Sequence, residues 1–415
     1  MGPMYRELAK TAFAYPIIDN HAHPFLKEKH RNSIRYEVFV SEAQDDALDD
    51  AIYTLPCFRA AAQLSKLFGL KGNDATWEGV KKTRLELDYA ELCKLCMVPT
   101  GIQCILFDDG LGGIADMAED LNWHDKYTGS PSKRIVRLEV EGQNILQDIL
   151  IANDNSPLSV DILCDTFLQE FTTYMNAAAE DDHVVGYKSV ACYRTGLDIN
   201  PAPCSMDELH QCLAAASEQL KEKDSIRFQH KALNDHLVKI VLDIAGKCKK
   251  PIQFHTGLGD NDITLTTSSP AHMQPIIKAF PETIFVLLHS SYPYTRDAGY
   301  LTSVYKNVYL DFGEIFPFIS AEGQRNVIHE VLELAPTNKI LWSTDAAWWP
   351  ERFYLATVQA REAIYEVLAG YVSKQELTED QAVSIVKMAF FDNANRIYKL
   401  GLKPNTSILS PQLSP

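Results

Sequence analysis

Eight short apolar segments, each followed by a stretch of helical periodicity, limit most strongly how this chain can fold. They cover residues 16–24, 101–107, 135–139, 184–190, 251–257, 284–289, 308–312 and 340–345. Short apolar runs of this kind are typical of buried strands. Strands separated by helices pair in parallel, because a crossover helix is the usual connection between parallel neighbours. Eight such units predict an α/β fold, a closed (β/α)₈ TIM barrel, with an open doubly wound sheet as the alternative.

The stretch from about residue 25 to 99 is too long for a simple crossover between the first two strands. Its apolar residues recur at helical spacing. We therefore expect a helical insertion after the first strand that caps one end of the sheet and helps to wall the pocket. Residues 1–403 are then a single barrel domain. Residues 404–415, rich in Ser and Pro, are expected to be a flexible tail.

Side chains that can bind metal gather at one end of the predicted strands. The first strand ends in His21 and His23, and a spacing of two residues points both imidazoles to the same face. Further candidates end the fourth, fifth, sixth and eighth strands: Lys188, His255, His289 and Asp345. In a barrel these ends meet at one mouth, where the active sites of this architecture lie. A single strand histidine is more often a core residue, but four histidines and an aspartate at matching ends predict a metal site.

Charge and composition limit the partners and the compartment. The formal net charge is −16, from 39 basic and 55 acidic side chains, which argues against nucleic acid or an anionic membrane as the main partner. The sequence has no uninterrupted apolar stretch of about 18 residues. Nine scattered cysteines suit reduced thiols. No glycine-rich nucleotide motif is present. We expect a cytoplasmic protein that binds a small molecule.

The strand-end motifs resemble the metal-dependent amidohydrolase superfamily. They are similar in particular to the amidohydrolase-related branch that includes the N-terminal half of the fungal FluG and plant nodulin/glutamine synthetase-like fusion proteins. The motifs are His21-Ala-His-Pro, Gly186-Tyr-Lys-Ser with Tyr193 and Arg194, Phe254-His-Thr-Gly, Leu288-His and Ser343-Thr-Asp345-Ala. The resemblance runs from about residue 5 to 400. The glutamine synthetase half has no counterpart here, so we expect any activity to be self-contained.

The resemblance implies roles for these side chains. His21, His23 and Asp345 would hold a divalent ion, zinc or else manganese or iron, and one or two ions would bind. His255 would complete the metal shell. Asp345 would accept a proton from the activated water and deliver it to the leaving group. His289 would either ligate a second metal or donate a hydrogen bond to the substrate carbonyl.

Lys188 and Arg194 each leave alternatives open. Lys188 resembles the lysine that is carboxylated and bridges two metals in binuclear members of the superfamily. It could instead act as an ammonium that contacts a substrate carboxylate or polarises its carbonyl, or extend to solvent from a strand end. Arg194, next to Tyr193, suits bidentate binding of a substrate carboxylate, with a surface salt bridge as the alternative.

Three classes of function follow. The leading hypothesis is a metal-dependent hydrolase that cleaves a C–N bond, an amide or cyclic amide, in a small carboxylated substrate. The alternative is a metal-dependent non-oxidative decarboxylase or lyase of an aromatic or unsaturated carboxylic acid, because relatives in the branch use almost the same ligands. A regulatory or scaffolding protein is the third class. Barrels of this kind often form homodimers, although nothing in the sequence marks an interface.

Overall fold

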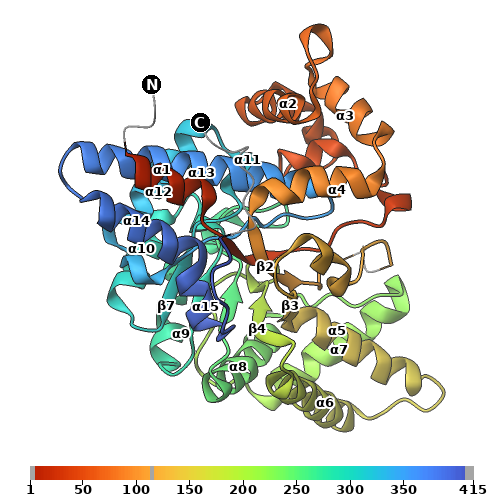
Figure 1. Cartoon of the computed structure of the whole chain (residues 1–415). Helices are drawn as coiled ribbons and strands as arrows, with labels where there is room; N and C mark the ends of the chain where they lie inside the picture. Colours follow the sequence, from red (N-terminus) through yellow and green to blue (C-terminus); the bar gives the residue numbers. More distant parts are fainter. Residues whose placement is uncertain (1–4, 113–115, 407–415) are drawn as a thin grey trace.

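The strands form the predicted parallel barrel. The computed structural model describes residues 5–112 and 116–406 and contains one eight-stranded sheet in the order β1 to β8, with every pairing parallel (Figure 1). The strands are β1 (Ile17–Ala22), β2 (Ile102–Asp108), β3 (Lys133–Arg137), β4 (Val184–Ser189), β5 (Ile252–Phe254), β6 (Phe285–Leu287), β7 (Val308–Asp311) and β8 (Ile340–Leu341). The (β/α)₈ fold class is therefore confirmed, and the open doubly wound sheet is excluded.

Backbone bonds between β1 and the segment after β8 bring the two ends of the sheet together. The amide of Asn20 donates to the Trp342 carbonyl at 3.4 Å, and the amide of Asp345 donates to the His21 carbonyl at 3.0 Å. The amide of His23 donates to the Ala346 carbonyl at 2.8 Å. These bonds place the metal-capable ends of the first and eighth strands next to each other.

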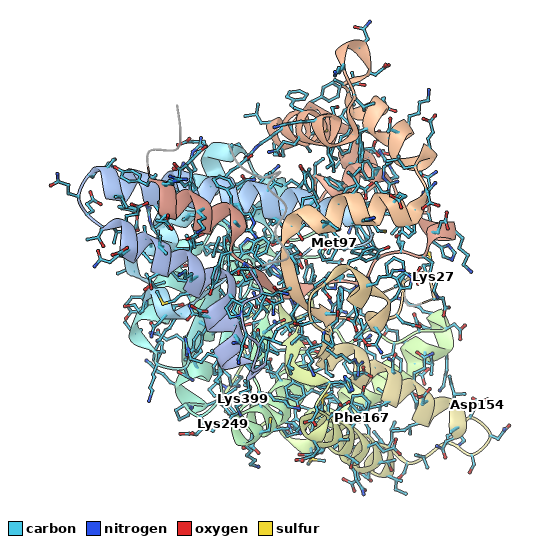
Figure 2. The ribbon with its side chains drawn as sticks, in the orientation of Figure 1. Lys27, Met97, Asp154, Phe167, Lys249 and Lys399 are labelled. Carbon is cyan, nitrogen blue, oxygen red and sulfur yellow. The ribbon has the colours of Figure 1, made fainter. Side chains whose placement is uncertain are left out.

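Helices surround the sheet, as Figure 1 shows. Those on the barrel are α1 (Arg6–Ala14), α5 (Leu138–Ala152), α6 (Val160–Glu180), α7 (Met206–Lys223), α8 (Lys231–Cys248), α9 (Gln274–Ala279), α10 (Thr295–Val304), α11 (Ile315–Phe318), α12 (Ala321–Leu334), α13 (Pro350–Ser373), α14 (Glu379–Lys387) and α15 (Asn393–Ile397). Capping boxes at Ser205 and Thr378 begin α7 and α14. Phe167 of α6 is fully buried and packs against Phe171 and Phe228 (Figure 2).

The predicted insertion between β1 and β2 is helical and has its own apolar cluster. It contains α2 (Leu55–Phe68), α3 (Trp77–Glu86) and α4 (Tyr89–Met97). Tyr36 stacks on Trp77 at 5.0 Å between ring centroids, and Trp349, directly before α13, packs against Tyr36. The insertion thus buries its apolar side chains against α13, beside the mouth of the barrel.

The third strand ends earlier than the sequence suggests. β3 stops at Arg137, and the next residues, 138 and 139, begin α5, which we did not predict from the sequence. The buried face of α5 includes Gly142, Leu146 and Ile149, at helical spacing. Leu138 is apolar like Ile135 and Val136 of the strand, so local pattern alone does not mark the change from strand to helix.

The end of the described chain lies against β2. The Gln103 amide nitrogen donates to the Lys403 carbonyl at 2.9 Å, and its oxygen accepts from the Asn405 amide at 2.8 Å. Of the predicted tail, residues 407–415 lie outside the described part of the chain. Within that part, no helix is both long and apolar enough to cross a lipid bilayer.

Candidate metal centre and active site

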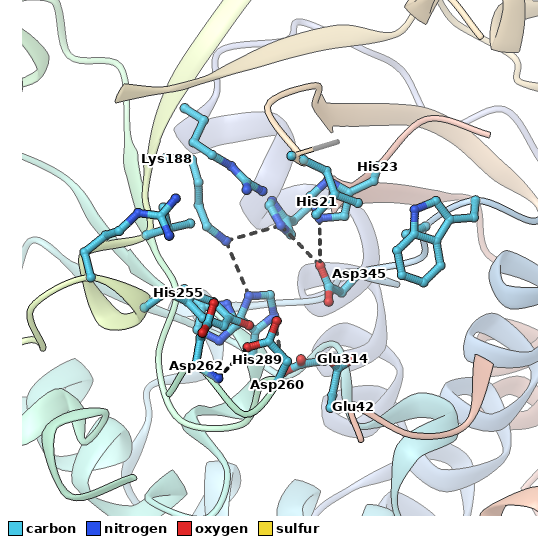
Figure 3. Close-up of a pocket in the computed structure, with 18 of the residues that line it drawn as sticks. His21, His23, Glu42, Lys188, His255, Asp260, Asp262, His289, Glu314 and Asp345 are labelled. Atoms are coloured by element: carbon cyan, nitrogen blue, oxygen red, sulfur yellow. Dashed lines mark hydrogen bonds and ion pairs between the residues drawn. The ribbon is translucent and has the colours of Figure 1, made fainter. Parts of the chain in front are cut away.

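A cavity of about 490 Å³ opens at the C-terminal ends of the strands, and every site residue predicted from the sequence lines it (Figure 3). They are His21, His23, Lys188, Tyr193, Arg194, His255, His289 and Asp345. The insertion also reaches this cavity, because Glu42 and Gln44 form part of its wall. The barrel therefore brings together residues that are more than 300 positions apart in the chain.

Hydrogen bonds fix the orientation of the first two histidine rings. The Gln253 amide nitrogen donates to the Asn20 carbonyl at 2.7 Å, so its oxygen faces His21 Nδ1, at 2.8 Å, and can only accept. His23 Nδ1 lies 2.8 Å from the Asp108 carbonyl oxygen, which can also only accept. Both Nδ1 atoms therefore carry a hydrogen, and Nε2 is the nitrogen that each ring directs into the cavity.

Asp345 completes an electron-rich group of atoms. Its Oδ1 lies 3.2 Å from His21 Nε2 and 3.5 Å from His23 Nε2 (Figure 3). Burial and the nearby Lys188 lower the pKa of His21 to about 4. Burial alone would raise the pKa of Asp345, but His289, His21 and His23 hold it well below its usual range. The Asp345 oxygen thus lies beside the Nε2 atoms of both histidines, and imidazole and carboxylate groups are ligands that suit a divalent cation.

Two overlapping groups of possible ligands occur among the described residues. Their ligand atoms lie within 4.8 Å of one another: His21, His289 and Asp345 in the first group, and His21, His23 and Asp108 in the second. Asp108, at the end of β2, was not predicted as a site residue. Its carboxylate already binds Arg137, with Nη2 to Oδ2 at 2.6 Å. The strand-end position that identified the histidines also applies to Asp108 and could have identified it.

Lys188 lies between two imidazoles. Its Nζ is 3.3 Å from His21 Nε2 and 3.4 Å from His289 Nε2, and the side chain is only 1% exposed. Burial lowers the pKa of Lys188 to about 8. The lysine does not extend to solvent, so of the three sequence-based interpretations the carboxylated lysine and the ammonium that contacts the substrate remain.

His289 is held at a sharp bend after β6. Residues 289 to 291 all have positive φ, at 69°, 55° and 50°. The His289 amide donates to Asp311 Oδ2 at 3.2 Å, and Asp311 also accepts from Ser343 Oγ at 2.9 Å. Because Nε2 of His289 faces Lys188, its Nδ1 carries the hydrogen and faces Glu314 Oε2 at 3.6 Å. The bend directs the ring into the cavity.

His255 lies beside the candidate ligands rather than among them. Its Nε2 donates to the Leu258 carbonyl at 2.6 Å. Its ring packs on Tyr193 and His289, with centroids 4.4 and 4.3 Å away. His255 belongs to neither group of ligand atoms found in the described residues. Its assignment to the metal shell stays a prediction.

Arg194 has no ion-pair partner among the described residues, and its buried Nε has no hydrogen-bond partner there. Burial and the neighbouring Arg227 lower the pKa of Arg194 to about 10, so the side chain remains charged at neutral pH. Arg227 itself is bonded to Asp262, at 2.9 Å. An unpaired guanidinium in a cavity wall suits an anionic ligand group.

Comparison with known proteins found a matching family model and a similar curated protein. The amidohydrolase family model matches residues 227–400, which include His255, His289 and Asp345. The chain is 41% identical, over 98% of its length, to protein fluG of Emericella nidulans. It spans about half of that relative, 48% of its length.

Solved structures share the fold. A Lactobacillus casei ATCC 334 protein, assigned provisionally as a metal-dependent hydrolase, is 26% identical, with a TM-score of 0.78 over 95% of this chain and 98% of that one. A uronate isomerase from Bacillus halodurans C-125 is 14% identical, with a TM-score of 0.64 over 95% and 96% of the two chains. At 14% identity, the likeness to the uronate isomerase concerns the fold alone.

Proposed function

Since this chain belongs to the amidohydrolase family, we propose that it is a metal-dependent hydrolase that cleaves the C–N bond of an amide or cyclic amide in a small carboxylated molecule. The observation that carries the proposal is the convergence of His21 Nε2, His23 Nε2 and Asp345 Oδ1. Both histidines have Nδ1 bonded to an acceptor elsewhere, so Nε2 is the atom that each turns toward Asp345 and that is free to bind a cation.

The bound ion, Zn²⁺ or else Mn²⁺ or Fe²⁺, would supply Lewis acidity that lowers the pKa of water. His21, His23 and Asp345 would hold it. Asp345 also accepts the proton of the attacking water and passes it to the leaving nitrogen. Lys188 donates a hydrogen bond to the substrate carbonyl as negative charge develops on its oxygen. Arg194 binds the substrate carboxylate.

The surroundings of Lys188 support its action as an ammonium group. Its Nζ lies inside the cavity, 3.3 Å from His21 Nε2 and 3.4 Å from His289 Nε2, and therefore beside the proposed ligands, where it can donate to a substrate carbonyl. A carboxylated Lys188 that bridges two ions is the alternative. Metal analysis separates the two: about one ion per chain, unaffected by bicarbonate, agrees with the ammonium, whereas about two, dependent on bicarbonate, agrees with the carbamate.

The proposal is tested with the metal-loaded protein and a panel of N-acyl amino acids, cyclic amides and aromatic carboxylic acids. We expect release of an amine from at least one amide, and Asp345→Asn should lower the rate at least about a hundredfold because proton transfer is lost. Release of CO₂ without amide cleavage would instead identify a decarboxylase. A metal-loaded protein that turns over no member of the panel would agree with the regulatory class.

A further inference from the structure

Charged side chains of both signs line the cavity. Carboxylates of Glu42, Asp260, Asp262 and Glu314 lie on one side of the close-up, across from Lys188 (Figure 3). The two signs are not segregated, because Asp262 binds Arg227, the neighbour of Arg194, at 2.9 Å. Two groups stand apart from these pairs: Arg194 forms no ion pair with any described residue, and Glu314 forms none with a lysine or arginine there.

On the acidic side, Glu314 is the carboxylate that lacks a partner. Glu42 faces Arg352 at 3.7 Å, and Asp262 binds Arg227. Glu314 is 1% exposed, and neither of its oxygens accepts a hydrogen bond from any residue in the described ranges. Its closest partner is His289 Nδ1, at 3.6 Å, beyond hydrogen-bond distance. An ionised carboxylate in this state is unfavourable, and burial raises the pKa of Glu314 well above its usual range. A cationic group that binds here would stabilise the ionised form.

The backbone directs Glu314 into the cavity at a cost. Its φ of 62° and ψ of −45° place it in a γ-turn, and the Ile315 amide donates across it to the Gly313 carbonyl at 2.8 Å. This conformation is strained for a residue with a side chain, and such strain gathers at functional sites. Gly313, directly before it, is closely packed against Ser343. The turn follows β7, which, like β2 and β3, supplies no predicted ligand.

We propose that the cavity takes a zwitterionic substrate, whose carboxylate binds Arg194 and whose ammonium group binds Glu314. This inference rests on the proposed hydrolase and names its substrate class. Glu314 and Lys188 face opposite nitrogens of the same His289 ring. An ammonium held by Glu314 therefore lies close to the carbonyl held by Lys188, as in an α-amino amide. The cavity, at about 490 Å³, has room for a molecule the size of a dipeptide.

Three compounds with one skeleton test the two contacts separately. L-Alanyl-L-alanine carries both charges, N-propionyl-L-alanine lacks the ammonium, and L-alanine ethylamide lacks the carboxylate. Zinc-loaded protein is titrated with each by calorimetry, and kcat/KM replaces Kd for any compound that is hydrolysed. We expect the zwitterion to bind about tenfold to a hundredfold more tightly than either analogue, as charged hydrogen bonds in a buried site would give.

Variants assign the preference to residues. Glu314→Gln should abolish the preference for L-alanyl-L-alanine over N-propionyl-L-alanine but keep its preference over L-alanine ethylamide. Arg194→Met should abolish the preference over L-alanine ethylamide but keep the preference over N-propionyl-L-alanine. Glu322→Gln is the matched control, since Glu322 is an exposed carboxylate on the nearby helix α12 whose partner is Arg325. It should retain both preferences.

Several outcomes would overturn the inference. Equal affinity of the wild type for the zwitterion and the propionyl compound would do so, and this comparison needs no variant to fold. Absence of binding of all three compounds at millimolar concentration would do so as well. If Glu314→Gln loses zinc and weakens all three compounds equally, the residue only orients His289.

The two proposals fail in different ways. Selective binding of the zwitterion without any amide cleavage would leave the inference standing and refute the hydrolase. Cleavage of anionic amides with no preference for an ammonium group would leave the hydrolase standing and refute the inference.

Discussion

His21 shows how one hydrogen bond prepares a ligand. Gln253 fixes its tautomer, and Gln253 is fixed in turn by the Asn20 carbonyl and by the Tyr398 hydroxyl, which accepts from it at 2.8 Å. Tyr398 comes directly after α15, so the last helix of the barrel helps to orient a residue of the first strand. Partners of this kind tune metal affinity strongly.

Replacement of Gln253 by Met should weaken metal binding about tenfold to a hundredfold, because Nδ1 of His21 loses its acceptor. Affinity is measured by competition with a chromogenic chelator. Gln103→Met is the matched control, because Gln103 is also a buried strand glutamine but bonds to Ser130 and Lys403. An equal loss in both variants would indicate a general effect on folding instead.

His124 has a structural role that predicts a pH dependence. Its Nε2 accepts from the Phe25 amide at 3.0 Å, and it is 1% exposed. Burial lowers the pKa of His124 from 6.5 to about 4. Between these values the unfolded chain binds the proton and the folded chain does not, so His124 contributes stability that is present at neutral pH and lost as the pH falls.

Wild-type unfolding free energy should therefore fall by about 3 kcal/mol more than that of His124→Gln between pH 7 and pH 4. The glutamine oxygen can still accept from the Phe25 amide but does not titrate. Urea denaturation at a series of pH values measures the difference. Parallel pH profiles of the two proteins would contradict the assignment.

Helix α13 ties the insertion to the barrel. At its start, Glu351 Oε1 accepts from Arg84 Nε of α3 at 2.5 Å, and both side chains are buried. Further along the same helix, Arg361 donates to the carbonyls of Ala12, Tyr15 and Thr100. The same helix also supplies Arg352 to the cavity. Movement of α13 would therefore disturb the insertion and the site together.

Replacement of Arg84 by Met should destabilise the protein by about 3 to 5 kcal/mol, because it leaves Glu351 buried and unpaired. Chemical denaturation measures the change. The double variant Arg84→Met/Glu351→Leu should recover most of the loss, since it removes both charges. A single variant within about 1 kcal/mol of wild type would show that the pair adds little.

At the scale of the molecule, the metal should stabilise the whole barrel, because its proposed ligands come from both ends of the sheet, β1 and the segment after β8. An ion that binds only the folded chain adds about 2.7 kcal/mol at a hundred times its Kd. We expect Zn²⁺ to raise the Tm of metal-free protein in differential scanning calorimetry and Asp345→Asn to lose most of that shift. A Tm rise of the same size in the variant would exclude Asp345 as a ligand.

Strand-end residues were predictable because their chemistry is unusual for a buried strand. His21, His255 and His289 each interrupt or end an apolar run, and parallel strands must present such ends at one mouth. Glu314 carries no comparable signal, because it follows Asp311-Phe312-Gly313 as an acidic residue in an apparent loop. Its burial and lack of a partner arise from the γ-turn and the packing of segments distant in sequence.

The sequence by itself determined the order of the strands and the set of strand ends where chemistry occurs, because both follow from local hydrophobic periodicity. The tertiary structure decided which nitrogen of each histidine faces the cavity, that Lys188 is buried between two imidazoles, and that Arg194 and Glu314 are left unpaired. Tautomers and unpaired charges depend on hydrogen bonds and Coulomb interactions between segments hundreds of residues apart. Such contacts exist only once the barrel has closed.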